Sequence, residues 1–230
     1  MRKSIQLTLF NDLILTQRAD VDEAREMLEA LKSQGIVIGT DEAGRGALAG
    51  PVVAAAVYLT QEQEDELLAH KLRDSKRLTP CSREKIFAFM NQIGVEWSAY
   101  PAGIDVIESQ NILRASLFAM NQSICRLIKR MAKTPNCVIV DGNTRIPDLP
   151  FSQWTLIKAD DLIPVVSAAS VVAKVIRDRL MKNLDERYPG YNFAKNKGYP
   201  TQQHIDTVRR KGICGIHRES FCRKFLLNRR

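Results

Sequence analysis

The chain has 230 residues, of which 45% are hydrophobic, and its formal net charge is +8 at pH 7. This length suits one domain with extensions, and the hydrophobic share is enough for a packed core. No apolar run approaches the ~20 residues of a membrane span, and we find no small-residue cleavage site of a signal peptide, so we expect a cytoplasmic protein.

The cysteines and the distribution of charge narrow the class of protein further. The five cysteines are odd in number and contain no Cys-x-x-Cys pair, which argues against a zinc ribbon or a disulfide framework and favours a reducing compartment. Residues 170–230 hold 15 Lys and Arg against 5 Asp and Glu, so the rest of the chain has a net charge of −2. A basic carboxyl-terminal quarter fits either a polyanionic partner or a solvated basic tail.

Hydrophobic periodicity predicts the elements in chain order. Residues 1–18 are weakly patterned, and residues 20–34 predict a helix that ends at Gly35. Residues 61–68 predict a surface turn or a short helix. Strands are predicted at residues 36–40, 52–58, 95–100, 137–140 and 154–158. The main helices are predicted at residues 79–93, 112–131, 164–184 and 202–211.

This order of elements predicts an α/β fold. Three successive early strands suit an antiparallel meander, whereas later strands that are separated by helices suit parallel pairing. We therefore expect a mixed five-stranded sheet with helices on its faces and a helical carboxyl-terminal extension. The expected units are an amino-terminal extension with one helix (1–34), a central domain (35–187) and a basic extension packed on that domain (188–230).

Acidic residues follow three of the apolar runs: Asp41 and Glu42 after the first, Asp141 after the fourth and Asp160 after the fifth. A solvated Asp-Glu pair at a hairpin, with Arg45 as partner, would be the simplest interpretation of the first two. If all of them converge at one sheet edge, however, like charges destabilise the fold unless a cation neutralises them. An all-oxygen set without His or Cys favours Mg²⁺ over zinc. A two-metal carboxylate site beside a basic surface indicates phosphodiester hydrolysis.

The glycine-rich turn carries a family resemblance. The run Asp41-Glu42-Ala-Gly44-Arg45-Gly46, followed by Leu-Ala-Gly-Pro-Val, resembles the signature of bacterial ribonuclease HII. The resemblance extends from about Gly35 to Phe221 and includes Asp74-Ser-Lys, Asp141-Gly-Asn, Ser167-Ala-Ala-Ser with Ala173-Lys174, and His217-Arg-Glu-Ser-Phe. It implies a ribonuclease H-like fold with sheet order 3-2-1-4-5. In that order the strands before Asp41 and Asp141 are parallel neighbours.

The resemblance also implies an activity and a set of site residues. The family cleaves the RNA of RNA–DNA hybrids and cuts 5′ to single ribonucleotides in duplex DNA, with Mg²⁺ or Mn²⁺ in a two-metal site. Its catalytic, metal-binding carboxylates correspond to Asp41, Glu42, Asp141 and Asp160. The last of these lies in Lys158-Ala159-Asp160, which resembles the family's Lys-Gly-Asp motif; because Ala159 replaces the glycine, Asp161 is the alternative to Asp160. Gly44, Arg45 and Gly46 resemble the turn that reads the 2′-hydroxyl, although Ala47 stands where a proline is usual. Tyr199 resembles the tyrosine that stacks on the sugar at the RNA–DNA junction.

For other side chains the sequence indicates a functional role less clearly. We expect Lys76, Lys174 and Arg177 to contact the nucleic-acid backbone, although cations on a helix face are usually solvated. His204 fits a structural or surface histidine, and His217 fits a phosphate contact or a cap. The expected partners are an RNA–DNA hybrid and DNA that contains ribonucleotides, without a membrane, and the expected state is a monomer. The alternatives are a non-catalytic nucleic-acid-binding protein and ribonuclease HIII, which carries a longer amino-terminal domain.

Overall fold

The sheet that the sequence predicts is present, with one further strand at its edge. The structure is a computed structural model that describes residues 14–15, 21–70, 72 and 78–226. Its strands are Ile14–Leu15 (β1), Val37–Ala43 (β2), Val52–Tyr58 (β3), Glu96–Ala102 (β4), Cys137–Asp141 (β5) and Ser152–Leu156 (β6). Their spatial order, β1-β6-β5-β2-β3-β4, is the predicted order of five strands extended by β1.

Strand direction divides the sheet into two halves. β2 pairs antiparallel with β3, and β3 pairs antiparallel with β4, which forms the predicted meander. β5 is parallel to both β2 and β6, and β1 is parallel to β6. Thr40 of β2 lies opposite Val140 of β5. The next residue in each strand is an aspartate, so Asp41 and Asp141 lie at the same edge of the sheet.

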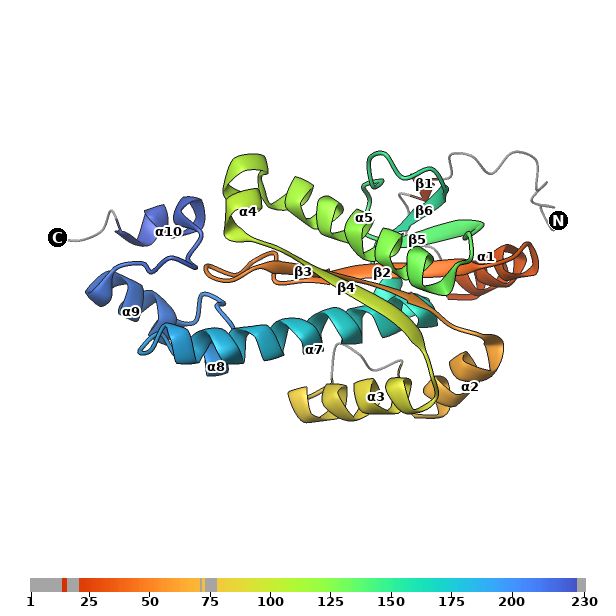
Figure 1. Cartoon of the computed structure of the whole chain (residues 1–230), viewed down its shortest axis with the longest axis horizontal. Coiled ribbons are helices and arrows are strands. Elements are labelled where there is room, and N and C mark those ends of the chain that lie inside the picture. The colour runs from red at the N-terminus through yellow and green to blue at the C-terminus, as the bar shows by residue number, and fades with distance from the viewer. Residues whose placement is uncertain (1–13, 16–20, 71, 73–77, 227–230) are drawn as a thin grey trace.

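Helices cover both faces of this sheet (Figure 1). The helices before β5 are Val21–Ser33 (α1), Gln61–Ala69 (α2), Pro80–Gln92 (α3), Ile104–Gln110 (α4) and Ile112–Met131 (α5). Those after β6 are Ala159–Leu162 (α6), Pro164–Arg187 (α7), Phe193–Asn196 (α8), Gln202–Lys211 (α9) and Glu219–Leu226 (α10). α5 packs against β3 and β4, whereas α7 packs against β2 and β3 on the opposite face. Within the described residues, no helix is both long enough and apolar enough to cross a membrane.

The alternation of side chains along β2 aims one acid at α7. Val37 joins the buried cluster that includes α7, and Ile38 joins the cluster that includes α5. Asp41 lies on the same face as Val37, because side chains two residues apart share a face of a strand. Gly39 lies between them on that face, where a Cβ would come within 2.7 Å of the Val165 carbonyl group. The glycine therefore lets the first turn of α7 approach the strand.

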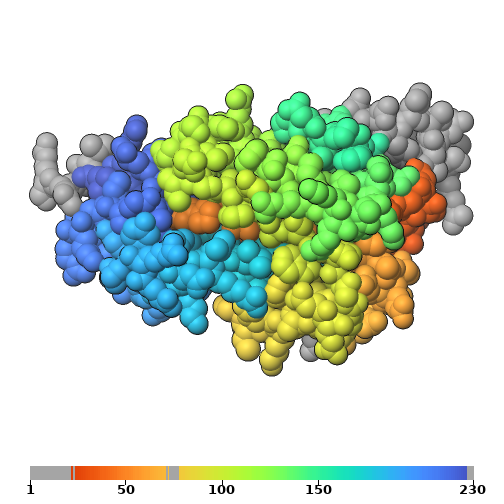
Figure 2. All heavy atoms as spheres, in the orientation of Figure 1, coloured from red at the N-terminus to blue at the C-terminus, as the bar shows by residue number. Residues whose placement is uncertain are grey.

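The carboxyl-terminal helices gather at one end of the molecule, toward which the β2–β3 hairpin extends (Figure 1). A small buried cluster joins the hairpin loop and α7 to this segment; its members are Ala49, Met181, Tyr191, Phe193 and Ile216. In the space-filling view, an orange strip in the colour of the hairpin stays visible between the green and blue layers (Figure 2). The hairpin therefore reaches the surface beside the carboxyl-terminal segment.

One predicted boundary needs correction, and the alternative left open for residues 61–68, a surface turn or a short helix, is decided in favour of a helix. The fifth strand is Ser152–Leu156 rather than 154–158 because Lys158 adopts a positive φ of 62° and α6 begins at Ala159. The acidic stretch after β3 forms the helix α2, which Thr60 caps by accepting a hydrogen bond from the Gln63 amide at 3.2 Å. The predicted amino-terminal helix is present as α1, and its Leu28 and Leu31 are buried in the main core.

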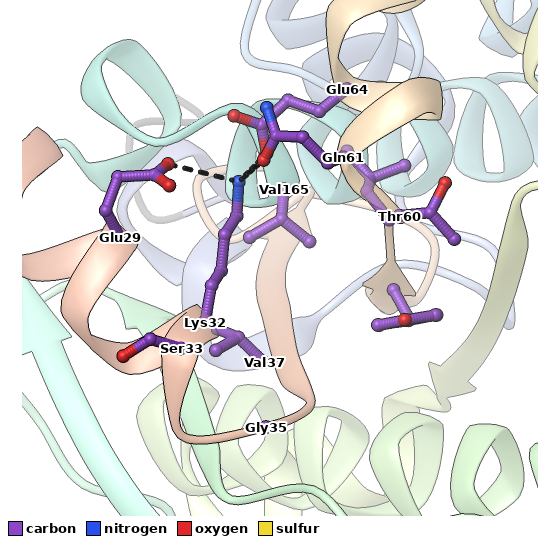
Figure 3. A pocket seen from close by; sticks show the side chains of 11 residues that line it. Glu29, Lys32, Ser33, Gly35, Val37, Thr60, Gln61, Glu64 and Val165 are labelled. Carbon is purple, nitrogen blue, oxygen red and sulfur yellow. Dashed lines mark hydrogen bonds and ion pairs between the residues drawn. The ribbon is translucent and has the colours of Figure 1, made fainter.

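A pocket of about 380 Å³ lies where β2 begins, away from the strand end that carries the acids (Figure 3). Lys32 of α1 points between two carboxylates there, at 2.7 Å from Glu64 and 3.5 Å from Glu29. The Glu64 side chain is only 6% exposed, so its charge requires this partner. The contact ties α1 to α2 and gives the amino-terminal helix a structural role.

Candidate active site

Four carboxylates are positioned by the ends of three neighbouring strands. Asp41 and Glu42 lie near the end of β2, and Asp141 is the last residue of β5. Asp160 lies in α6, which follows β6 after a short turn. The Asp141 carboxylate accepts a hydrogen bond from the Ala159 amide at 2.7 Å, which holds the start of α6 against the end of β5. This hydrogen bond places Asp160 beside the other acids.

The four acids interact electrostatically with one another. Burial raises the pKa of Asp41 well above its usual value, and the charges of Glu42, Asp141 and Asp160 raise it further, whereas a hydrogen bond from Ser170 lowers it. Burial also raises the pKa of Glu42, with smaller contributions from Asp141 and Asp160, whereas Arg45 opposes the rise. The guanidinium of Arg45 lies 3.3 Å from the Glu42 carboxylate. Asp41 and Glu42 are therefore costly to ionise unless a cation joins the cluster.

The donor set fits a hard divalent cation. All of the acids offer oxygen ligands, which Mg²⁺ and Mn²⁺ prefer. Among the described residues, however, no three acidic, histidine or cysteine side chains already converge to metal-ligand distances. One Asp41 oxygen accepts a hydrogen bond from the Glu42 amide at 2.7 Å, and Asp141 is similarly held by Ala159. The acids are close enough to repel one another, and the carboxylates would have to change their arrangement to bind a metal.

Burial separates the two candidates for the fourth acid. Asp160 is 4% exposed and acts on the pKa of both Asp41 and Glu42, whereas Asp161 is exposed. The Ser167 hydroxyl of α7 donates to the Asp160 carbonyl, which fixes this turn. The geometry favours Asp160 over Asp161.

Two buried arginines hold the glycine-rich loop between β2 and β3. Arg177 of α7 donates to the carbonyls of Pro51 at 3.0 Å and Ala49 at 3.2 Å. Arg218, which precedes α10, donates twice to the Gly50 carbonyl, at 2.8 and 3.1 Å, and once to that of Arg45 at 2.8 Å. The loop carbonyls thus point toward the arginines, and Arg45 and Gly46 stay exposed.

The burial of Arg177 corrects one expectation. Its side chain is 1% exposed, so it does not offer its charge to a phosphate in this structure. Arg177 instead supports the loop, and its guanidinium lies 5.1 Å from the ring centroid of Tyr199. Lys174, one turn earlier on α7, donates to the Ser170 hydroxyl at 2.7 Å. This places Lys174 next to the acid cluster, because Ser170 hydrogen-bonds Asp41.

Tyr199 stands near the loop with its ring available. The side chain is 39% exposed, although its ring lies beside the buried guanidinium of Arg177. The preceding Gly198 carbonyl accepts from the amides of Leu48 at 2.8 Å and Ala49 at 3.3 Å. The tyrosine and the glycine-rich loop are thus joined through main-chain hydrogen bonds. The predicted nucleic-acid contact Lys76, with the rest of its Asp74-Ser-Lys motif, lies outside the described residues.

Sequence reasoning missed Arg218 and the pairing of His204 with His217. These histidines are buried, and their Nε2 atoms lie 3.0 Å apart. The burial of Arg177 did have a readable signal: it follows Ala173 by four residues and precedes Met181 by four, on an apolar helix face. No comparable pattern surrounds Arg218, since its partners are carbonyls about 170 residues earlier in the chain.

We expect Arg218→Lys to lower the free energy of unfolding by about 3 kcal/mol, because a lysine keeps the buried charge but cannot reach both carbonyl groups. Urea denaturation measures this loss. Arg223→Lys is the matched control: its side chain is 68% exposed and lies 3.9 Å from Glu219. That change should cost less than about 0.5 kcal/mol. Equal effects of the two substitutions would contradict the supporting role of Arg218.

The histidine pair predicts a loss of stability in mild acid. Burial and the neighbouring His204 lower the pKa of His217 from 6.5 to about 4. The unfolded chain therefore takes up a proton before the folded chain does. The pair's full contribution is present above pH 6.5 and is lost as the pH falls toward 4, by up to about 3 kcal/mol. Urea denaturation between pH 7 and 4 should show a shallower decline in His217→Asn than in the native chain, and parallel curves would contradict this origin.

Comparison with known sequences shows the family of the chain. The family model described as ribonuclease HII matches residues 38–224. Ribonuclease HII of Acaryochloris marina is 42% identical over 193 residues, which cover 83% of this chain and 96% of that protein. Ribonuclease HII 2 of Methylibium petroleiphilum is 44% identical over 198 residues, which cover 85% of this chain and 87% of that protein.

Solved structures share the fold. Ribonuclease H2 from Pyrococcus horikoshii matches with a TM-score of 0.64 and 26% identity, covering 83% of this chain and 96% of that one. The structure of Bst-RNase HIII in complex with Mn²⁺ matches with a TM-score of 0.68 but only 19% identity, covering 85% of this chain and 71% of that one. The latter likeness supports the fold alone. The chain belongs to the ribonuclease HII family, and it is an endoribonuclease of the ribonuclease H type.

Proposed function

We propose that this enzyme hydrolyses the RNA strand of RNA–DNA hybrids and cuts 5′ to single ribonucleotides in duplex DNA, as a monomer with two divalent cations. The observation that carries the proposal is the cluster of four carboxylates at one sheet edge, where burial, and to a smaller extent the charges of the neighbouring acids, raise the pKa of Asp41 and Glu42. Asp41, Glu42, Asp141 and Asp160 would hold Mg²⁺ or Mn²⁺. When bound, these ions would supply an activated water and neutralise charge at the phosphate.

In the proposed reaction, water attacks the phosphate, the bond to the 3′ oxygen breaks, and a proton passes to that oxygen. The products are a 3′-hydroxyl and a 5′-phosphate. The side chains of the site orient the phosphate against the four acids and exclude orientations of the phosphate that water cannot attack. Lys174 lies close enough to the cluster, through Ser170, to contribute a positive charge there.

Recognition of the ribonucleotide is assigned to the loop and to Tyr199. Hydrogen bonds within the described residues engage the amides of Ala47, Leu48, Ala49 and Gly50. The exposed turn at Arg45 and Gly46 is therefore the part of the loop that can meet a 2′-hydroxyl, the group that separates RNA from DNA. The ring of Tyr199 would stack on the adjoining sugar. We assign residues 188–230 to a basic extension that supports this surface.

A cleavage assay on a long hybrid tests the proposed reaction. A labelled RNA strand paired with DNA, incubated with Mg²⁺, should yield fragments with 3′-hydroxyl ends that a polymerase can extend. The same RNA paired with RNA should stay whole, because the proposed substrate is the RNA strand of an RNA–DNA hybrid. Fragments that end in a 2′,3′-cyclic phosphate would contradict the water-attack mechanism, since they arise from attack by the ribose itself.

A further inference from the structure

Three main-chain and side-chain hydrogen bonds run in one direction through the buried histidine pair. The Cys214 amide donates to His217 Nδ1 at 2.9 Å. A nitrogen that accepts cannot carry a proton, so His217 is protonated at Nε2 and donates to His204 Nε2 at 3.0 Å. His204 is then protonated at Nδ1, from which it donates to the Tyr199 carbonyl at 2.9 Å. Each histidine has only one tautomer that satisfies all of these contacts.

The surroundings keep this pair neutral. His204 is 0% and His217 4% exposed. The ring of Phe193 lies 5.5 Å from His204 by centroid distance, and that of Tyr191 lies 4.9 Å from His217. A protonated histidine in this apolar setting would lose its acceptor nitrogen and face the other ring without solvent. The pair therefore works as a fixed connector between Cys214 and Tyr199.

The connector ends at the main chain that carries the exposed aromatic ring. The Tyr199 carbonyl accepts hydrogen bonds from His204 and, at 2.8 Å, from the Thr201 amide, and the Tyr199 amide donates to the Asn196 carbonyl at 2.9 Å. One residue earlier, Gly198 approaches the glycine-rich loop so closely that a Cβ there would lie 2.3 Å from the Ala49 carbonyl oxygen. Both sides of the tyrosine main chain are therefore fixed, and rotation about its side-chain bonds is the freedom that remains.

We propose that His204 and His217 are positioning residues that hold Tyr199 at the angle needed to recognise an RNA–DNA junction. This inference rests on the proposed function, in which the tyrosine ring stacks on the sugar at the junction. Neither histidine touches the substrate. They set the height of the ring beside the loop by fixing its carbonyl, and a shift of about 1 Å in such a group can cost up to about 100-fold in rate.

Two substitutions at His204 separate this role from general stability. Glutamine places its amide near the position of the histidine Nε2, so His204→Gln keeps an acceptor for His217 but loses the donor to Tyr199. Asparagine places its amide near Nδ1, so His204→Asn keeps the donor to Tyr199 and loses the contact with His217. Both substitutions remove the imidazole ring of His204 and break one of the two hydrogen bonds that its nitrogens make, so their costs in stability should be similar.

The measured quantity is the ratio of kcat/KM for a single-ribonucleotide duplex to kcat/KM for a long hybrid. We expect His204→Gln to lower this ratio about 10-fold, and His204→Asn to change it less than about 3-fold. Thermal unfolding of both variants accompanies the kinetics. If the glutamine variant is unfolded at the assay temperature, His217→Asn takes its place. It keeps the acceptor for Cys214 but no longer fixes His204 in the tautomer that donates to Tyr199, so it should also lower the ratio. His204→Asn escapes this effect because an amide always carries a donor. Equal ratios in the glutamine and asparagine variants, or an unchanged ratio in His217→Asn, would overturn the proposal.

A double-mutant cycle with Tyr199→Ala shows whether His204 acts through the tyrosine. We expect His204→Gln to lower the ratio no further once the ring is absent, because the two changes remove the same contact. An additive loss would mean that His204 acts by another route. Failure of the native enzyme to cut either substrate would instead contradict the proposed function, so the two failures remain distinct.

Discussion

Asp41→Asn should reduce cleavage at least about 1,000-fold, because the change removes a central carboxylate from the cluster and with it several kcal/mol of transition-state stabilisation. Binding of a hybrid should change less than about 3-fold, since basic side chains elsewhere supply the affinity for phosphates. Gel cleavage and a fluorescence binding assay measure the two quantities. Cleavage at the native rate in this variant would contradict the assignment of Asp41 to the metal site.

The same substitution should stabilise the metal-free protein by about 1 kcal/mol, because it removes a charge that is buried beside three other carboxylates. The asparagine oxygen can still accept the Glu42 amide, so the local hydrogen bond is kept. Mg²⁺ should then raise the unfolding temperature of the native chain but not that of the variant. Asp161→Asn is the control at an exposed acid of the same segment, and it should retain cleavage within about 3-fold.

Gly44→Ala should lower the free energy of unfolding by about 2–4 kcal/mol and cleavage by at least about 100-fold. Gly44 has a φ of +97°, and a Cβ there would lie 2.0 Å from Nε of Arg177. The methyl group would displace the buried guanidinium that holds the carbonyls of Ala49 and Pro51. Urea denaturation and the gel assay measure the two losses.

Gly46→Ala is the matched substitution in the same loop. A Cβ at this position meets no atom within 4 Å, and φ is not positive, so stability should change by less than about 1 kcal/mol. Cleavage should still fall about 10-fold if the substrate approaches this exposed turn as closely as we propose. Comparable losses of stability in the two alanine variants would contradict the difference in packing between the two glycines.

Much of the fold followed from local pattern, because strand, turn and helix signals alternate clearly between residues 36 and 184. The strand β1 did not, because two residues give no periodicity and its place depends on pairing with β6. The edge where Asp41 and Asp141 meet was predictable from strand order. The place of Asp160 was expected from the family resemblance, whereas the hydrogen bond from the Ala159 amide to Asp141, which helps to hold its turn, has no signal in the sequence.

The basic carboxyl-terminal quarter shows where charge alone misleads. Its excess of Lys and Arg suggested a surface for a polyanion, yet two of its arginines are almost fully buried. Arg177 and Arg218 bind main-chain carbonyls of the glycine-rich loop. Such partners cannot be found in the sequence, because a carbonyl group belongs to every residue, whereas an acidic partner would be visible. The same limit applied to His204 and His217, which lie 13 residues apart and meet only through the turn between α9 and α10.

The most direct test of the metal-dependent cluster uses two duplexes. One is all DNA, and the other carries a single ribonucleotide in one strand; each is incubated with the native protein, once with Mg²⁺ and once with EDTA. We expect one cut, 5′ to the ribonucleotide, that needs Mg²⁺ and leaves the all-DNA duplex intact. Binding without a cut, with Mn²⁺ as well as Mg²⁺ and on long hybrids too, would contradict the account and favour a non-catalytic nucleic-acid-binding protein.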